Sequence, residues 1–130
     1  MPTILIVEDE TALSRVLREA FELKLPNTQV ATAVGWEDAL QAVEGFPDGL
    51  DLLLTDQHLA VHTGLDLHVH LRNRYPTLRT IIYTGKATPA VESAAVQAGA
   101  RVVWKPQRLN VLINLVRQEL DLTEHGSARH

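Results

Sequence analysis

The sequence contains no cysteine, and this absence excludes disulfide bonds, thiol chemistry and cysteine-ligated zinc. Basic residues are also few: 12 lysines and arginines stand against 16 aspartates and glutamates, which gives a formal net charge of −4. A chain of this charge has no basic field to attract nucleic acid or an anionic membrane surface. We therefore expect neither of them as a partner.

Long hydrophobic runs are missing as well. No apolar run approaches the roughly 20 residues of a membrane-spanning helix, and the chain opens on the apolar segment 3–7 without a charged leader. The 130 residues show no internal repeat or linker and suffice for one domain with its own core. We expect one cytoplasmic domain over residues 1–121. A polar tail over residues 122–130 would be too short for a DNA-binding or catalytic domain.

Five short apolar segments predict β-strands, and between them apolar residues recur three and four positions apart, as on the buried face of a helix. The predicted strands are residues 3–7, 29–33, 50–55, 79–84 and 101–104. This alternation predicts an α/β fold in which right-handed crossovers build a doubly wound parallel sheet. The near-continuous apolar character of residues 50–55 suits a strand that is covered on both faces.

The helices have recognisable starts and one ambiguous member. Thr11 can cap the first helix, whose predicted buried stripe includes Val16 and Phe21. Pro89 suits the first position of an alanine-rich helix. The segment 65–71 alternates like a strand but also fits a helix, and the surrounding order of strands and helices favours the helix.

The carboxyl ends of the predicted strands carry polar residues. Glu8 and Asp9 follow the first strand, Asp56 ends the third, Thr84 ends the fourth, and Lys105 follows the fifth. Open α/β sheets bind ligands in the crevice beside these ends. Three carboxylates gathered there would repel one another, and Mg²⁺ with oxygen ligands would relieve the repulsion. A carboxylate such as Asp56 can then attack phosphorus, while Lys105 and the Thr84 hydroxyl neutralise and hydrogen-bond the transferred group.

The chain resembles the receiver domain of two-component response regulators over essentially its whole length. The matching pieces, in chain order, are Glu8-Asp9, Asp56, Gly64, Thr84-Gly85, Gly99-Ala100 and Lys105-Pro106. The resemblance implies a flavodoxin-like (βα)5 fold with strand order 2-1-3-4-5. It also implies a stand-alone phosphoacceptor that is served by a histidine kinase or a histidine phosphotransfer protein and acts by partner binding or phosphorelay.

The resemblance assigns a role to each site residue. Asp56 would be the phosphoacceptor, Thr84 the switch hydroxyl and Lys105 the phosphoryl-binding lysine. Mg²⁺ would be held by the pair Glu8-Asp9, by Asp56 and by the backbone carbonyl of His58. Self-phosphorylation and autodephosphorylation would then be the only chemistry, so the protein would not be an enzyme in the ordinary sense.

Three departures from the family pattern concern how a signal leaves the domain. Ala60 stands where a proline is usual, the stretch from Gly99 to Lys105 is one residue shorter, and Val102 replaces the usual aromatic switch residue. We expect Trp104 and the helix over residues 89–98 to form a surface for a homodimer or a downstream protein. The alternative is that Trp104 fills the core.

Other functions deserve comparison with the receiver. A haloacid-dehalogenase-type phosphohydrolase also uses a strand-end aspartate with Mg²⁺, but it needs a second aspartate at the position of His58. A receiver-like scaffold that is not phosphorylated is a further alternative. His58 and His62 are spaced by about one helical turn, but this spacing indicates a transition-metal site only if their loop is helical, and His68 and His70 would lie on different sides of a helix.

Overall fold

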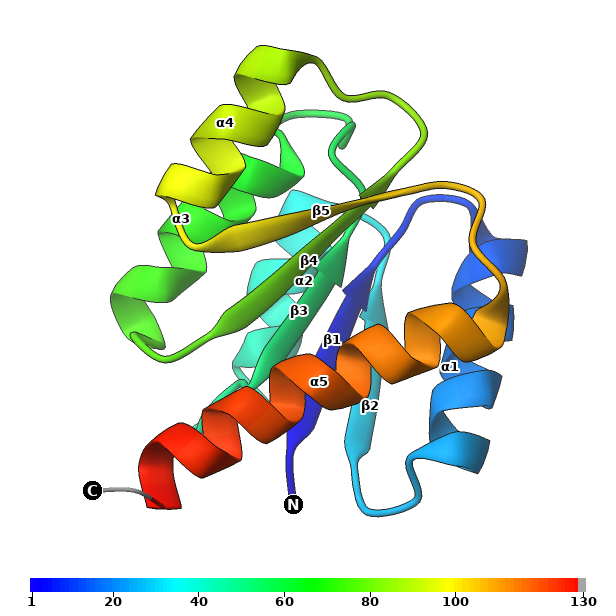
Figure 1. The fold of residues 1–130 in the computed structure, drawn as a ribbon, viewed down its shortest axis with the longest axis vertical. Coiled ribbons are helices and arrows are strands. Elements are labelled where there is room, and N and C mark those ends of the chain that lie inside the picture. The colour runs from blue at the N-terminus through cyan, green and yellow to red at the C-terminus, as the bar shows by residue number, and fades with distance from the viewer. Residues whose placement is uncertain (129–130) are drawn as a thin grey trace.

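The computed structural model describes the backbone of residues 1–128 and the side chains of residues 1–121. Five parallel strands form one sheet in the order β2-β1-β3-β4-β5 (Figure 1). The strands are β1 (Thr3–Val7), β2 (Gln29–Ala33), β3 (Leu52–Thr55), β4 (Arg79–Thr84) and β5 (Ala100–Trp104). The helices are α1 (Thr11–Lys24), α2 (Trp36–Val43), α3 (Gly64–Arg74), α4 (Pro89–Gln97) and α5 (Leu109–Ala128). The predicted α/β fold and strand order are confirmed.

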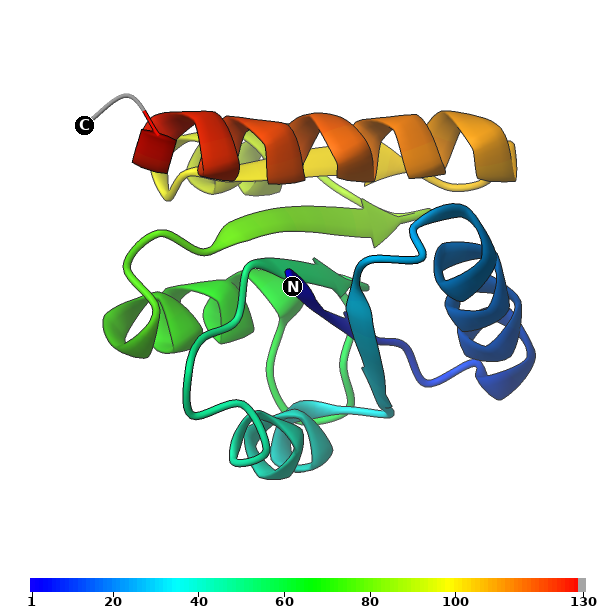
Figure 2. The same cartoon turned by 90° about the horizontal axis from the view of Figure 1, so that it is seen from below.

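Two apolar layers hold the sheet between its helices, because side chains alternate between the two faces of each strand. On one face, Ile4, Ile6 and Ile81 pack with buried residues of α1 and α5. On the other face, Leu5 and Leu53 pack with α2 and α3, while α4 joins this side through a smaller cluster. Figures 1 and 2 show the sheet lying between these two groups of helices.

The ambiguous segment is a helix, and its first residues explain why. Thr63 precedes α3, its hydroxyl accepts from the amide of Asp66, and the Asp66 carboxylate accepts from the amide of Thr63. This reciprocal capping box fixes the helix start. Leu67 and His68 lie on the buried face of α3, whereas His70 is exposed, as the helical spacing predicts.

Three local predictions are corrected. Thr11 is the first residue of α1 rather than its cap; the capping position is Glu10, whose side chain makes no capping hydrogen bond. Val16 is 45% exposed, so the buried stripe of α1 is narrower than predicted. Helix α5 continues to Ala128, past residue 121, where we expected a tail to begin. The side chains of residues 122–128 and all of residues 129–130 lie outside the described part, so the domain boundary stays a prediction.

The length and polarity of the helices decide whether any of them could span a membrane. Within the described part of the chain, every helix is too short or too polar to span a bilayer.

Candidate functional site

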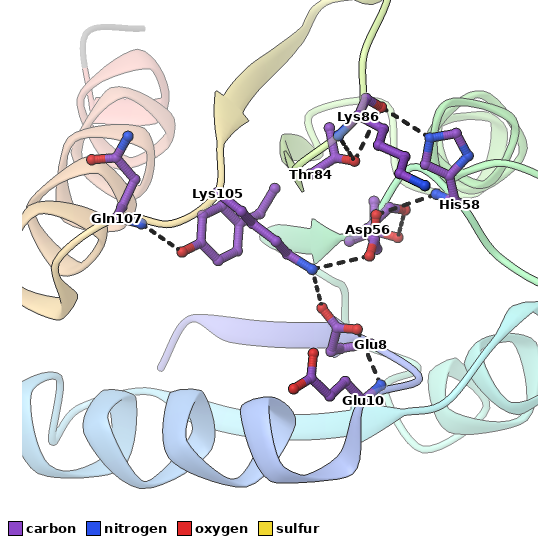
Figure 3. A network of polar contacts seen from close by, with 10 residues as sticks. Glu8, Glu10, Asp56, His58, Thr84, Lys86, Lys105 and Gln107 are labelled. Carbon is purple, nitrogen blue, oxygen red and sulfur yellow. Dashed lines mark hydrogen bonds and ion pairs between the residues drawn. The ribbon is translucent and has the colours of Figure 1, made fainter.

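The carboxyl ends of β1, β3, β4 and β5 meet at one edge of the sheet, because all the strands are parallel and in register. Residues at the ends of β1, β3 and β4 border a pocket of ≈ 580 Å³. The pocket is lined by Asp9, Asp56, His58, Thr84, Gly85 and Lys86. Lys105 adjoins it through its ion pair with Asp56, and Glu8 through its ion pair with Lys105 (Figure 3). The five residues that the sequence predicted to gather at the strand ends therefore do come together.

Lys105 is the centre of the charge arrangement. Its Nζ donates to Glu8 Oε1 at 2.7 Å and to Asp56 Oδ2 at 3.0 Å (Figure 3). The side chains of Glu8, Asp56 and Lys105 are 5%, 16% and 20% exposed, so these ion pairs are largely shielded from solvent. One ammonium thus bridges the ends of β1, β3 and β5, and it is poised to contact any group added to Asp56.

Burial and pairing act against each other on these three groups. Burial raises the pKa of the Glu8 carboxyl, and its bonds to Lys105 and to the Glu10 amide only partly offset this. Burial alone would also raise the pKa of Asp56, but Lys105 and the His58 amide outweigh burial and lower it. Burial opposes the charge of Lys105, yet its bonds to Glu8 and Asp56 raise its pKa. The lowered pKa of Asp56 therefore favours its ionised form at neutral pH.

The acidic residues fit a divalent cation. Glu8, Asp9 and Asp56 each offer one carboxylate oxygen, and these three oxygens lie within 4.8 Å of one another. A small cation with carboxylate and water ligands suits such a donor set. Glu8 is less available than Asp9, because its Oε1 accepts from Lys105 and its Oε2 accepts from the Glu10 amide. Asp9 is exposed and borders the pocket.

Gly64 lies against the backbone of the strand-end aspartate. A Cβ at this position would meet the carbonyl oxygen of Asp56, and it would lie 2.9 Å from Cγ2 of Thr55. Only glycine lets α3 begin this close to β3. Gln57 secures the same loop, since its carbonyl accepts from the Gly64 amide and its side chain accepts from the Leu65 amide. The turn that presents Asp56 is thus fixed by packing.

The loops after β3 and β4 are tied together above the pocket. The imidazole Nε2 of His58 lies 2.9 Å from the carbonyl oxygen of Lys86. The Thr84 hydroxyl donates to the same oxygen and accepts from the Lys86 amide, both at 3.2 Å. Figure 3 shows the Lys86 side chain running back toward Asp56 and His58. Sequence reasoning placed Thr84 correctly but missed the contact made by the His58 ring.

Most of the chain matches a known family. The model of the response regulator receiver domain covers residues 4–117. The chain belongs to the response regulator receiver family. Among solved structures, the receiver domain is similar to a CheY-like receiver protein from Methanospirillum hungatei (25% identity, 97% of this chain and 98% of that chain, TM-score 0.87). A putative Luxo repressor receiver domain from Vibrio parahaemolyticus shares the fold at 22% identity, 99% and 97% coverage and a TM-score of 0.84.

Curated relatives extend well beyond this receiver domain. The alginate biosynthesis transcriptional regulatory protein AlgB of Pseudomonas syringae pv. tomato is 31% identical over 97 residues, which are 75% of this chain and 21% of the relative. The AlgB protein of Pseudomonas aeruginosa matches equally, at 31% over 97 residues. The chain spans about a fifth of the length of these relatives, so the likeness concerns that part of them alone.

Two other histidines in the described part of the chain make contacts outside the pocket. His62 and His70 both pack against Trp36, at ring-centroid distances of 4.4 and 5.1 Å. The ring of His58 contacts Lys86 instead, so the spacing of His58 and His62 does not bring their rings to a common partner. The chemistry-bearing cluster of the site is therefore acidic rather than imidazole-based.

Two further residues near Lys105 were not identified from the sequence. Tyr83 precedes Thr84, so strand alternation points it to the opposite face, where its ring lies 5.5 Å from Lys105 Nζ. The Tyr83 hydroxyl accepts from the Gln107 amide at 2.9 Å. The Lys105-Pro106 peptide bond is cis. The bond between Tyr83 and Gln107 thus fixes the path of the chain after the Lys105-Pro106 pair.

The departures at β5 have a clear structural outcome. Val102 is half-buried beneath α4 with Ala95 and Ala100. Trp104 lies on the same side of β5 but is 43% exposed, and its Nε1 donates to Glu92 Oε1 of α4 at 2.8 Å. The alternative that Trp104 fills the core is therefore wrong. Only Ala95 of α4 is fully buried, so most of this small apolar helix faces outward.

Proposed function

We propose that Asp56 accepts a phosphoryl group from the phosphohistidine of a sensor histidine kinase or a histidine phosphotransfer protein. The observation that carries the proposal is the contact between Asp56 and Lys105, at 3.0 Å, in a pocket that also holds the carboxylate of Asp9 and the Thr84 hydroxyl. The lowered pKa of Asp56 supports the same role, because an ionised carboxylate is the nucleophile that this transfer needs.

The chain's own residues account for the transfer. An Asp56 carboxylate oxygen forms a bond to phosphorus, the bond from phosphorus to the histidine nitrogen breaks, and the histidine keeps the electron pair. Lys105 already contacts Asp56 and would neutralise one phosphoryl oxygen. The Thr84 hydroxyl would donate to another, after leaving the Lys86 carbonyl that it contacts now. Attack by water on phosphorus would break the bond from phosphorus to the Asp56 oxygen, release inorganic phosphate and return the carboxylate, and we propose no other enzymatic activity.

We propose Mg²⁺ as the cation of the acidic cluster. Asp9 and Asp56 would bind it directly, Glu8 would act mainly through water, and the His58 carbonyl would complete the protein ligands. The exposure of Asp9 and the pairing of Glu8 with Lys105 support this division. When bound, Mg²⁺ supplies charge that offsets the carboxylates and the phosphoryl oxygens.

We further propose that the signal leaves by partner binding or by onward phosphotransfer, through a surface made by α4 and Trp104. This surface would take a second copy of the chain or a downstream protein. The exposed Trp104 and Val96, which is 73% exposed, support it. That the domain acts alone, and in the cytoplasm, stays a prediction.

The family match favours the receiver over the haloacid-dehalogenase alternative, whose second aspartate is replaced by His58. The scaffold alternative is decided by experiment. With acetyl phosphate and Mg²⁺, the intact mass of the protein should increase by one base-labile phosphoryl group, and Asp56→Asn should abolish the increase. Labelling that persists in Asp56→Asn contradicts the assignment, and an unlabelled wild-type protein supports the scaffold.

A further inference from the structure

The end of α4 is held by two side chains of α3. Ala98 is the C-cap of α4, and its carbonyl oxygen accepts from His68 Nε2 at 2.7 Å and from Arg72 Nη1 at 3.0 Å. A carbonyl oxygen can only accept, so the Nε2 of His68 must carry the proton and donate it. The end of α4 is therefore joined to residues that stand 30 and 26 positions earlier in the chain.

Both donors are themselves fixed in place. The His68 ring is fully buried, and burial lowers its pKa, which favours the neutral ring. Its Nδ1 then accepts from the Thr80 hydroxyl of β4 at 2.7 Å. The Nε of Arg72 donates to the Pro76 carbonyl at 3.2 Å. Neither side chain can turn away from the end of α4 without losing a second hydrogen bond.

The turn from α4 into β5 is shaped around the same guanidinium. Gly99 has a φ of 81°, a conformation that glycine adopts without strain. A Cβ at Gly99 would also meet Nη1 of Arg72, so glycine leaves the space that the guanidinium occupies. The positive charge of Arg72 at this end complements the negative end of the helix dipole of α4. Backbone, space and charge therefore agree on one position for the end of α4.

The start of α4 is held by less. In the described part of the chain, the other side-chain hydrogen bond between α4 and a different element runs from Trp104 Nε1 to Glu92 Oε1, at 2.8 Å on the surface. Thr88 caps the helix by accepting from the Val91 amide, which is a bond within the helix start itself. Few buried contacts and exposed hydrogen bonds are typical of a segment that moves easily. The two ends of α4 therefore differ in how firmly they are attached.

We propose that His68 and Arg72 are positioning residues that make the end of α4 a pivot, so that phosphorylation displaces the first turn of the helix and leaves its end in place. The inference rests on the proposed function, in which the Thr84 hydroxyl turns to the phosphoryl group and α4 with Trp104 forms the output surface. The loop after Thr84 leads into the first turn of α4, so that end receives the displacement. The output surface then changes around Glu92 and not around Gly99.

The first test measures amide hydrogen exchange, residue by residue, in the resting protein. The amides of Ala98 and Gly99 donate to the carbonyls of Ala94 and Val96, so they report on the end of α4. His68→Leu keeps an apolar side chain but removes the donor, and it should speed their exchange about fivefold relative to the amides of β1, in keeping with the loss of one hydrogen bond. General loosening of the core would speed β1 as well and leave this ratio unchanged.

Three further variants separate anchoring from packing. His68→Gln places an amide donor near the position of Nε2 and should restore most of the protection. Arg72→Met removes the second donor at a half-buried position that leaves the core intact, and it should raise the same ratio. Arg74→Met is the control, since Arg74 lies on the same helix but pairs with Glu44. An unchanged ratio in His68→Leu and Arg72→Met, or an equal rise in Arg74→Met, overturns the inference.

The second test adds beryllofluoride and Mg²⁺, with bound beryllofluoride followed by fluorine NMR. In the wild type, exchange should change at the Val91 and Glu92 amides of the first turn and stay unchanged at Ala98 and Gly99. In His68→Leu and in Arg72→Met, the change should extend to the end of the helix. A wild-type protein that binds no beryllofluoride overturns the proposed function, and this inference with it. Bound beryllofluoride with an equal change at both ends, or with none at the first turn, overturns the inference alone.

Discussion

The ammonium of Lys105 lies 3.0 Å from the carboxylate of Asp56, and in the same geometry it is 2.7 Å from Glu8. Before any phosphoryl group arrives, one cation therefore holds two carboxylates from different strands at the sheet edge. Removal of the lysine would leave two partly buried carboxylates without their partner, so its effect on stability can be measured without a phosphodonor.

Lys105→Met should lower the free energy of unfolding by about 1–3 kcal/mol at neutral pH, because it leaves partly buried carboxylates without their partner. Lys105→Arg keeps the charge, so its free energy of unfolding should fall by less. Urea unfolding without metal measures both. Mg²⁺ should stabilise Lys105→Met more than the wild type, since the acidic cluster then lacks its internal cation. Equal stabilisation by Mg²⁺ in the two proteins would contradict this account.

Gly64→Ala should destabilise the protein by about 1–3 kcal/mol, because the added methyl group meets the carbonyl oxygen of Asp56. Gly35→Ala is the matched control, since a Cβ at Gly35 has no atom within 4 Å. Thermal unfolding of both variants tests the difference. We also expect Gly64→Ala to slow labelling by acetyl phosphate, because the displaced backbone carries the acceptor. If Gly64→Ala is as stable as Gly35→Ala, the turn can rearrange to accept the added methyl group.

Asp9→Asn should bind Mg²⁺ poorly and yet raise the melting temperature in EDTA by about 2 °C, because it removes one negative charge from a crowded acidic cluster. Calorimetry in EDTA and titration with Mg²⁺ give the two values. Asp48→Asn, which removes the same charge at an exposed site outside the acidic cluster, is the control. If Asp9→Asn binds Mg²⁺ like the parent protein, the metal site lies elsewhere.

The pH dependence of stability should include a contribution from His68. Its ring is fully buried between the Thr80 hydroxyl and the Ala98 carbonyl, each at 2.7 Å. Burial lowers its pKa below the usual 6.5, the Ala98 carbonyl opposes this, and Arg72 adds to the lowering. The unfolded chain therefore binds a proton more readily than the folded protein. This part of the stability is complete above pH 6.5 and is lost as the pH falls from there through the pKa of the folded protein.

His68→Phe removes this titration. It should cost about 1–3 kcal/mol near pH 7.5, because Thr80 loses its partner, but its melting temperature should fall less than that of the wild type between about pH 7.5 and pH 5.5. His70→Phe is the control, since His70 is exposed. Parallel pH profiles for His68→Phe and the wild type would show that His68 contributes nothing to the acid sensitivity.

Much of this site could be predicted from the sequence, since strand order and strand ends follow from simple rules. Parallel strands bring their carboxyl ends to one edge, so Asp56, Thr84 and Lys105 had to be neighbours if the strands were placed correctly. It was harder to predict which carboxylate pairs with Lys105. The backbone amide of Glu8 continues the strand ladder by donating a hydrogen bond to the Ala33 carbonyl, and Glu8 is buried, whereas Asp9 is exposed.

Contacts between loops were not predictable, because no periodicity fixes where a loop side chain points. The bond from His58 to Lys86 depends on two loops that are 28 residues apart. From the sequence, Trp104 could either form an exposed surface or fill the core. Strand alternation gives its side of β5 but not how far α4 covers that side. The same limit applies to Val16, whose helical spacing matches the buried stripe although 45% of it is exposed.

The last prediction concerns how phosphorylation reaches the surface. The indole Nε1 of Trp104 donates to Glu92 Oε1 at 2.8 Å, so the end of β5 is tied to the first turn of α4. Thr84 ends the neighbouring strand β4 and pairs with Trp104 in the sheet register. If Thr84 moves toward a phosphoryl group on Asp56, it would shift the loop that leads into α4. This shift would change the environment of the indole.

Beryllofluoride with Mg²⁺ should therefore change the fluorescence of Trp104 in a Trp36→Phe background, which leaves Trp104 as the single tryptophan. Adding Glu92→Gln keeps the shape of the partner but weakens the bond, and it should move the resting spectrum toward the beryllofluoride spectrum. Asp56→Asn in the same background should show no response to beryllofluoride. A flat signal while Asp56 is demonstrably occupied would mean that the movement does not pass through Trp104 and α4.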